Sequence, residues 1–594
     1  MKRAIIVFIS VVVVGFAWQV WHDAANSARS FHYSYFGEKK YFDDAYAKAS
    51  LEGPFAFSEP PAALLVNQHL LASHLIAKTF DAAKSNRIKT VFLLTQNNWN
   101  AGTAPIITSL YDWKTPYGDI EGDPSQAQQF IKAGLATEDE SIFGNEHGIT
   151  GIVSFIKKSM PNARVIPFVI RDSVPEDQSF ALAQMLFEKS RPDTIVVASI
   201  DMSHYLPKAE SDFHDLKVLE TLRTLDFDST KSLDIDTPPT MRTLMKFAEL
   251  SGAERFELAG HENSADITNG PGLLSTTSYI DGAYVKGSIA EADPVETVLA
   301  MGDVMLDRAV RRHIENFGSN YPWKIVERFF LGNDVTVANL EGSFTSNPSV
   351  SEKDSSILHF TFDPSYAPHL AALGFDLFSA ANNHAFDFGK KGYEENRSVL
   401  AAAGIDSFGS PSNDMNLSFV RTIRGIRVAF IGYHEFYSPN PKPVLDEIAR
   451  LRSQADFIIV YPHWGVEYNL SASDDQVKLA HGFIDAGADA VIGSHPHVIE
   501  PIEVYKGKAI FYSLGNFLFD QDFSERTGQG LAVGVEIRPR EVSYDLFPVL
   551  IQNSQISFPD IAKRDAILAD LSKRSLMLGT ESGGILKGKI TLTR

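Results

Sequence analysis

The sequence predicts a protein of the α/β class, with two α/β domains that follow one N-terminal transmembrane helix. Three observations lead to this prediction. Short β-branched runs alternate with amphipathic stretches, as in "IKTVFLLT", "DTIVVASI", "IRVAFIGYH" and "ADFIIVYPHWG". The 594 residues are too many for one ordinary hydrophobic core. An uncharged apolar run stands close to the start of the chain.

The apolar run at residues 4 to 21, "AIIVFISVVVVGFAWQVW", follows Lys2 and Arg3. Such a run is just long enough to span a bilayer as one helix, and basic residues before it favour a cytoplasmic N-terminus. We therefore expect a single-pass protein of the cell membrane whose bulk is extracytoplasmic. A cleaved signal peptide is the alternative, because "AANSA" after the run offers small residues for a processing site.

The composition is that of a globular protein, with 44% hydrophobic and 22% charged residues. A net charge of -20 argues against binding to nucleic acid or to an anionic membrane surface, both of which need clustered lysine and arginine. The chain contains no cysteine, which excludes disulfides, thiolate nucleophiles and zinc-thiolate sites. Any metal must therefore be held by His, Asp, Glu or Asn.

A polar segment, "KGSIAEADPVET" at residues 286 to 297, separates two apolar strand candidates and contains Pro294. We place the boundary between the domains there. The expected division is a transmembrane anchor at residues 1–22, a juxtamembrane stalk at 23–54, a first domain at 55–288 and a second domain at 296–594.

In the second domain, metal-ligating residue types stand at the carboxyl ends of the predicted strands, where functional groups collect in open α/β sheets. "VIGSHPHVIE" is the most compact case, because it places His495 and His497 on either side of Pro496. Side chains two residues apart on a strand share a face, so both imidazoles are expected to aim at one point. The residues that share the strand-end placement are Asp303, Asn339, Glu341, Asn383, His384, His463, His495 and His497.

This mixture of carboxylate, amide and imidazole ligands suits Mn, Zn or Fe(II), and a bridging acid can hold two ions that activate a water. Each residue alone also has a structural explanation. Asp303 can cap a turn, Glu341 can pair with a lysine, and His384 can hydrogen-bond within a loop. The agreement of six strand ends favours a metal site.

The ordered series GD, NLEG, NNHxxD, HWG, SHPHV and YSLGNF resembles the CapA family of poly-gamma-glutamate capsule synthesis proteins, over roughly residues 296 to 540. That family is similar to calcineurin-like metallophosphoesterases, so the resemblance implies a β-sandwich flanked by helices. It also implies a metal shell of one or two ions, made by Asp303, Glu341, Asn383, His384, His463, His495 and His497.

In the same resemblance, Asn339 and Asp387 would support the metal shell and Asn516 would lie near its rim. His384 or His463 would protonate a leaving group. One position departs from the pattern: the phosphoesterases usually begin with Asp-x-His, whereas residue 305 is methionine. A single ion therefore stands beside two ions as an expectation.

The resemblance implies a function in the synthesis of capsule, poly-gamma-glutamate or another cell-envelope polymer, with a metal-dependent hydrolase or transferase site. The expected partners are an anionic or peptide-like envelope polymer, the membrane through the N-terminal helix, and other capsule-synthesis proteins. The alternative is a non-catalytic factor that binds polymer or assists its assembly or export.

The first domain contains "LTQNNWN", "GNEHGITG", "ASIDMSHYLP" and "HENSAD" in this order. The series resembles the MEMO-like family, the AmmeMemoRadiSam system protein B group, from about residue 55 to 288. That family is similar in fold to class III extradiol dioxygenases, and its cleft corresponds here to His69, Asn98, His147, Asp201 and His204. Asn98 stands where the family has a second histidine ligand, and no cysteine completes the metal set. We therefore expect this domain to bind or scaffold, in preference to a dioxygenase-type redox function.

Overall fold

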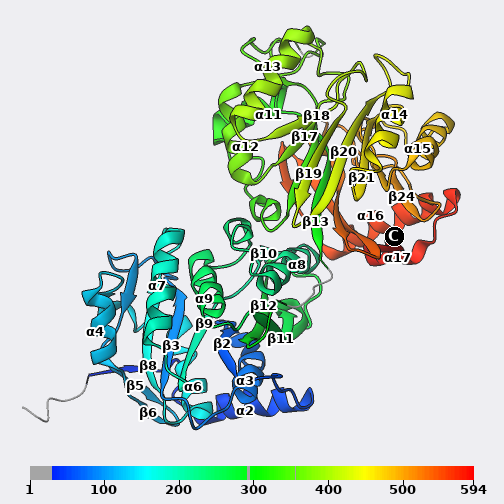
Figure 1. The fold of residues 1–594 in the computed structure, drawn as a ribbon. Coiled ribbons are helices and arrows are strands. Elements are labelled where there is room, and N and C mark those ends of the chain that lie inside the picture. Colours follow the sequence, from blue (N-terminus) through cyan, green and yellow to red (C-terminus); the bar gives the residue numbers. More distant parts are fainter. Residues whose placement is uncertain (1–29, 290–293, 355) are drawn as a thin grey trace, which may run out of the picture. The chain divides into compact units, whose positions relative to one another are not determined.

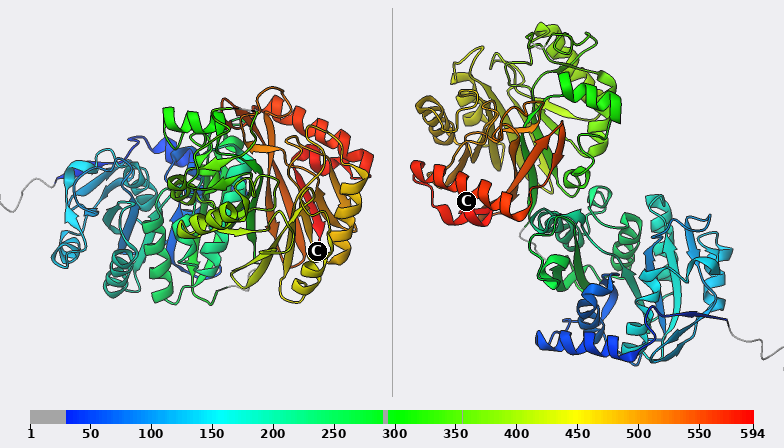
Figure 2. Two further views of the ribbon diagram at one scale, coloured as in Figure 1. Left: turned by 90° about the horizontal axis from the view of Figure 1, so that it is seen from above. Right: turned by 180° about the vertical axis from the view of Figure 1, so that it is seen from behind.

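The computed structural model describes residues 30–289, 294–354 and 356–594, which form two compact units (Figure 1, Figure 2). Unit 1 comprises the chain up to Asp201, together with Asp236–His261 and Tyr279–Ser288. Unit 2 comprises Met202–Ile235, Glu262–Ser278 and Ile289–Arg594. The chain thus passes between the two units several times.

The sequence led us to expect a single-pass membrane localisation. Judged by the helices that the structure describes, this expectation is wrong. Within residues 30–289, 294–354 and 356–594, no helix has both the length and the apolar character needed to cross a bilayer. The run at residues 4 to 21, from which the expectation came, lies outside the described residues. In the segment expected as a juxtamembrane stalk, the structure has β1 (Phe31–Tyr33) and α2 (Lys39–Leu51) within unit 1, and Phe42 is buried in the core.

Unit 1 is built on a sheet in which β2, β9, β3 and β8 run parallel and β12 pairs antiparallel with β2. These strands are nearly continuous apolar runs because helices cover both of their faces. Leu64, Val91 and Leu93 pack against Phe80 of α3 (Ser73–Ala82) and Phe155 of α6 (Val153–Ser159), in one core. The bounds of these strands and their partners are β2 (Pro61–Val66), β3 (Thr90–Gln96), β4 (Ile106–Thr108), β7 (Thr137–Glu138), β8 (Arg164–Ile170), β9 (Thr194–Ser199), β11 (Arg255–Asn263) and β12 (Thr276–Val285). A separate small sheet joins β1 to β5 (Asp112–Thr115) and β6 (Gly118–Ile120).

The helices of unit 1 lie along this sheet, and α7 packs on α9, which contacts β2, β9 and β3 (Figure 1). Their bounds are α3 (Ser73–Ala82), α4 (Pro124–Lys132), α5 (His147–Thr150), α6 (Val153–Ser159), α7 (Glu176–Lys189) and α9 (Pro238–Leu250).

Unit 2 contains two large sheets. The first has the order β18-β17-β14-β13-β26-β27-β28, with β25 beside β13 and β29 beside β27, and the second has the order β19-β20-β21-β22-β24-β23. Their strands are β13 (Glu296–Val304), β14 (Val335–Leu340), β17 (Leu377–Ser379), β18 (Asp406–Phe408), β19 (Ser418–Ile423), β20 (Ile426–His434), β21 (Phe457–His463), β22 (Ala490–Ile492), β23 (Ile502–Tyr505), β24 (Lys508–Phe511), β25 (Asn516–Leu518), β26 (Gln529–Ile537), β27 (Glu541–Gln552), β28 (Gln555–Ser557) and β29 (Lys589–Thr593).

The two sheets of unit 2 share one apolar core, in which Val298 and Val337 of the first sheet lie with Phe430 and Ile459 of the second. Helices pack on the outer faces, so the unit is a sandwich of two sheets between two helical layers. The helix bounds are α8 (Lys208–Thr224), α11 (Arg308–Phe317), α12 (Ala367–Leu373), α13 (Gly389–Ala402), α14 (Lys442–Leu451), α15 (Asp474–Ala486), α16 (Ile561–Ser575) and α17 (Ser582–Lys587). Figure 1 shows α11, α12 and α13 on the side of the first sheet and α14 with α15 on the side of the second.

The direction of the strands positions the candidate site. β13, β14 and β17 run parallel to one another in the first sheet, as do β20, β21 and β22 in the second. Carboxyl ends of parallel neighbours lie at one edge of a sheet. The loops after these strands are therefore brought together in space.

Candidate functional site

Two buried carboxylates stand at the ends of neighbouring strands in unit 2. Asp303 lies in β13 and Glu341 follows β14, and their side chains are completely buried or nearly so. Asn339 Nδ2 donates to Asp303 Oδ1 at 2.8 Å, and the backbone N–H of His495 donates to Oδ2 at 3.1 Å. Burial raises the pKa of Asp303 to about 7.

Glu341, unlike Asp303, accepts no hydrogen bond from the described residues. Neither of its carboxylate oxygens has a hydrogen-bond partner within the described residues, although both are buried. The Nε2 atoms of His497 and His384 lie 3.7 and 3.9 Å from Oε1. Burial, and then the charge of Asp303, raise the pKa of Glu341 well above its usual value. A buried polar group without partners is rare and costly.

Three imidazoles face these acids. One ligand atom each from Asp303, Glu341 and His463 lie within 4.8 Å of one another. His463 Nε2 is 3.1 Å from His495 Nδ1, and His497 Nδ1 is 3.5 Å from Asp303 Oδ2. Burial lowers the pKa of His495 to about 2 and that of His497 to about 3. The imidazoles are therefore neutral near pH 7, which is the form that binds metal.

His495 and His497 converge for a different reason from the one predicted. β22 ends at Ile492, so neither histidine is on a strand. Both have left-handed backbones, with φ of 96° at His495 and 56° at His497. The ring centroids are 5.9 Å apart because of this loop, and the predicted strand geometry is wrong. Such backbones cost about 1–3 kcal/mol each and gather at functional sites.

The loop after β17 closes another side of the site. Asn383 Oδ1 lies 2.7 Å from His463 Nε2. His384 Nδ1 is 2.8 Å from Asp387 Oδ2, which orients the ring. Asn382, which the sequence interpretation passed over, donates to Asn339 Oδ1 at 3.1 Å. The loop therefore holds both a potential ligand and a histidine with a carboxylate partner.

Two other positions show what surrounds the cluster. Asn516 begins β25 and is buried, and its Oδ1 lies 2.9 Å from His497 Nδ1. Met305 is buried in the core, and its sulfur accepts the N–H of Asp307 at 2.9 Å. Position 305 thus offers packing where the phosphoesterase pattern has an imidazole.

The cleft predicted in unit 1 has a polar floor whose side chains bond to one another. Asn98 Nδ2 donates to Glu146 Oε1 at 2.5 Å and to Gln68 Oε1 at 3.2 Å, and Asn98 Oδ1 accepts from Gln68 Nε2 at 3.4 Å. His69 Nδ1 lies 2.8 Å from the hydroxyl of Tyr279. Asn98, which stands where the resemblance has a histidine ligand, is thus hydrogen-bonded to neighbouring side chains.

The same floor borders a cavity of about 900 Å³ in unit 1. Its lining combines aromatic and aliphatic side chains with two of the predicted histidines, and consists of Tyr35, Phe36, Tyr41, Gln68, His69, Leu70, Leu71, Trp99, Gly144, Asn145 and His147. Of the other predicted residues, Asp201 is buried and accepts the N–H of Gln68 at 2.8 Å. His204 begins β10 (His204–Leu206), in the part of the chain that groups with unit 2.

Comparison with known proteins decides the family. A model described as bacterial capsule synthesis protein PGA_cap matches residues 297–521. PGA biosynthesis protein CapA of Bacillus subtilis (strain 168) is 30% identical over 304 residues, which cover 48% of this chain and 80% of that protein. The chain belongs to the PGA_cap family. Capsule biosynthesis protein CapA of Bacillus anthracis is 30% identical over 278 residues, which cover 43% of this chain and 67% of that protein.

The chain joins this PGA_cap region to a second one. A model of Memo-like proteins matches residues 67–280. A MEMO1 family protein of Caldivirga maquilingensis is 28% identical over 217 residues, which cover 35% of this chain and 76% of that protein. Both family resemblances inferred from the motifs are therefore confirmed.

One histidine of the PGA_cap region was missed by sequence reasoning. His434 ends β20, in register with His463 at the end of β21, and the two ring centroids are 5.9 Å apart. Its Nε2 is buried without a hydrogen-bond partner in the described chain, and burial lowers its pKa to about 4. The signal was present in "IRVAFIGYH", which ends in a histidine as "FIIVYPH" does.

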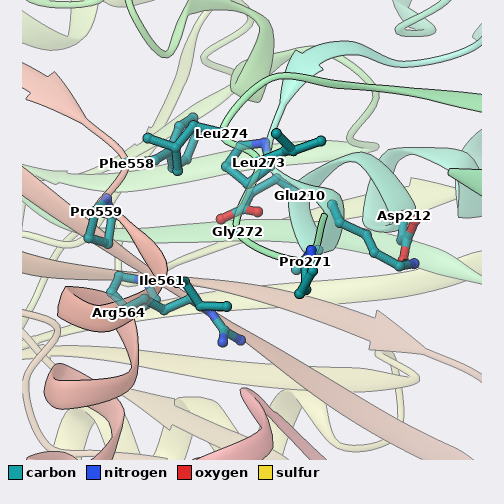
Figure 3. A pocket seen from close by; sticks show the side chains of 14 residues that line it. Glu210, Asp212, Pro271, Gly272, Leu273, Leu274, Phe558, Pro559, Ile561 and Arg564 are labelled. Atoms are coloured by element: carbon teal, nitrogen blue, oxygen red, sulfur yellow. The ribbon is translucent and has the colours of Figure 1, made fainter. Parts of the chain in front are cut away.

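A separate cavity of about 290 Å³ in unit 2 contains none of the predicted site residues (Figure 3). Its lining includes Glu210, Asp212, Leu273, Ile561 and Arg564. Burial raises the pKa of Glu210 to about 7. Lys208 and Arg564 also line this cavity, and none of its lining residues is a histidine, so it lacks the imidazoles that surround Asp303 and Glu341.

The buried acid of the Memo-like region leads to a pH prediction. Burial raises the pKa of Glu146 from 4.5 to about 7. Between these values the native state binds more protons than the unfolded state, so the stability of unit 1 falls as pH rises. Glu146→Gln should remove this fall, worth about 2–3 kcal/mol.

Hydrogen exchange of the β3 amides at pH 5 and pH 8 measures the effect of Glu146→Gln on the full chain. Glu188→Gln, on an exposed residue of α7, is the control and should keep the wild-type pH dependence. An unchanged dependence in Glu146→Gln would contradict the prediction.

Proposed function

We propose that the PGA_cap region holds one or two divalent ions and catalyses hydrolysis or group transfer in the synthesis of a capsule polymer of the polyglutamate type. The observation that carries this proposal is Glu341, a buried carboxylate without hydrogen-bond partners in the described chain, set within 4.8 Å of donor atoms from Asp303 and His463. The capsule and PGA functions named for the CapA relatives support the substrate class.

The donor set suits a borderline divalent ion. Carboxylates and neutral imidazoles together favour Mn, Zn or Fe(II) over Mg or Ca, which prefer oxygen alone. The residues that would hold the ions are Asp303, Glu341, Asn383, His463, His495 and His497, with Asn339, Asp387 and Asn516 supporting them.

When bound, the ion would polarise a carbonyl or phosphoryl group and lower the pKa of a water. The protein's own residues would then position and protonate the substrate. His384 is the better general acid of the two predicted histidines because its side chain is 12% exposed, whereas that of His463 is 1% exposed. Asp387 accepts a hydrogen bond from His384 Nδ1, which leaves Nε2 to carry the proton to a leaving group.

The Memo-like region is proposed as a binding cleft. Its polar floor is occupied by bonds among Gln68, Asn98 and Glu146, and its cavity is walled largely by aromatic and aliphatic side chains. Such a cavity suits ligand capture. A non-catalytic assembly factor remains the competing function for the whole chain, and other capsule-synthesis proteins are its proposed partners.

Metal content and turnover of the full chain test the proposal. We expect the wild type to retain Mn, Zn or Fe(II) after reconstitution and to cleave γ-linked glutamate oligomers or phosphoesters. His384→Gln should keep the metal and lose about 10²–10⁴-fold in turnover, because a general acid supplies that factor.

His481→Gln is the matched control, because His481 lies on α15 and bonds Glu503 at 2.9 Å. It should retain both metal and turnover. Metal retention without turnover of either substrate by the wild type would favour the assembly factor. A wild type that retains no metal would overturn the proposed site altogether.

A further inference from the structure

An arginine lies beside the proposed metal site and was not among the predicted site residues. Arg308 is the first residue of α11, five residues after Asp303 in the sequence. Its backbone is left-handed, with φ of 52°, which is unusual for an arginine. Strain of this kind persists where the surrounding structure requires a particular direction of the side chain.

Two phenylalanines hold the guanidinium of Arg308 against the site. Its centre lies 4.9 Å from the ring of Phe360 and 5.6 Å from that of Phe519. Phe360 packs on His384, with 4.2 Å between ring centroids, and Phe519 on His497, with 4.8 Å. One phenylalanine ring therefore lies between the guanidinium and His384, the proposed acid, and another lies between it and His497, a proposed ligand.

The ion pair of Arg308 leaves part of its fork unused. Nη2 donates to Asp520 Oδ1, while the other oxygen of Asp520 accepts the N–H of Ala309 at 3.1 Å. Nε is buried and has no hydrogen-bond partner among the residues described. The side chain of Arg308 is 16% exposed, so the guanidinium is paired with Asp520 and still reaches the surface.

We infer that Arg308 binds an oxyanion of the substrate, namely a carboxylate next to the bond that reacts. This inference rests on the proposed function. Every residue of a γ-linked glutamate polymer has a free α-carboxylate close to its amide, and a guanidinium is the side chain best suited to that group. A chain with a net charge of -20 repels such a polymer in general, so a cation at the site would direct its docking.

Binding of a γ-linked tetraglutamate to the full, Mn-loaded chain tests the role of Arg308 by calorimetry. Arg308→Gln should weaken this binding about ten- to hundredfold while metal affinity stays unchanged, because a charge-assisted hydrogen bond to substrate is lost. Arg308→Lys should lose less, because it keeps the charge without the fork. A tetramer with its α-carboxylates converted to carboxamides should bind weakly and equally to wild type and Arg308→Gln.

Two controls separate binding from folding. Arg308→Gln with Asp520→Asn removes both charges of the pair and should show the same loss of tetramer binding with an intact fold. Arg427→Gln, which breaks the exposed pair with Asp456, should bind as the wild type does.

Three results would overturn the inferred role of Arg308 or a part of it. Equal tetramer affinity in the wild type and in the Arg308→Gln, Asp520→Asn double variant, with metal retained, overturns the inference and leaves the proposed function standing. Inorganic phosphate is titrated into the wild type and Arg308→Gln by the same calorimetry. A loss of phosphate binding in Arg308→Gln without a loss of tetramer binding overturns the assignment to a carboxylate. A wild type that holds no metal overturns the proposed function and this inference with it.

Discussion

Replacing Glu341 with glutamine is expected to remove the metal and, at the same time, to stabilise the metal-free fold. Glu341 is buried beside Asp303 without a hydrogen-bond partner in the described chain, so the apo protein carries the desolvation cost of an unpaired acid. An amide of the same shape should relieve about 1–3 kcal/mol of that cost. The same change removes a negative ligand, and we expect metal affinity to fall at least about a hundredfold.

The variant is expected to lose metal affinity but to gain stability as the metal-free chain, and few other changes would produce both effects. Metal titration and denaturant unfolding of the apo chain would be measured on Glu341→Gln. Glu210→Gln is the matched control, because burial also raises the pKa of Glu210 but it lines a cavity without imidazoles. The control should gain stability and keep its metal. A Glu341→Gln variant that binds metal like the wild type would show that Glu341 is not a ligand.

Removing Arg424 should destabilise unit 2 by about 3–5 kcal/mol, the usual result of breaking a buried ion pair from one side. Arg424 Nη2 donates to Asp334 Oδ2 and to Glu296 Oε2, each at 2.7 Å, and Nη1 donates to Asp334 Oδ1 at 3.0 Å. The side chains of Asp334 and Glu296 are 2% and 0% exposed. Arg424→Met would leave Glu296 buried without its cation, and would leave Asp334 with only Lys217 at 3.7 Å and the hydrogen bonds from Thr297.

Hydrogen exchange of β13 and β14 amides is the measurement, since Glu296 begins β13 and Asp334 precedes β14. Arg427→Met is the control. Its pair with Asp456 is exposed, with side chains 43% and 37% accessible, and should be worth less than about 1 kcal/mol. Equal effects of the two variants would contradict the prediction. Adding Asp334→Asn and Glu296→Gln to Arg424→Met should restore part of the stability that unit 2 loses.

The alternation of strands and helices and the strand-end position of the site were predictable because both follow from local patterns. Buried parallel strands such as β21 are continuous apolar runs, and their ends are marked by the first polar residues. Asp303 and His463 were found by this rule. His434 follows the same rule at the end of β20.

The rest depended on geometry that spacing does not encode. Nothing in "SHPH" distinguishes a strand from a loop with two left-handed residues, because φ is set by the tertiary contacts around Pro496. Arg308 is an ordinary first helical residue until Phe360 and Phe519, distant in sequence, enclose it. The grouping of residues 202–235 with unit 2 likewise arises from long-range packing.

The proposed ligands come from two different sheets. Asp303 and Glu341 belong to the first, and His463 belongs to the second. An ion bound between them would connect the two sheets of the sandwich. Metal binding and folding would then be thermodynamically linked. At a free concentration one hundred times its dissociation constant, it would add about 2.7 kcal/mol to the stability of the sandwich. Chelation would then loosen the packing of one sheet on the other, and metal supply would set how long the folded chain survives proteolysis.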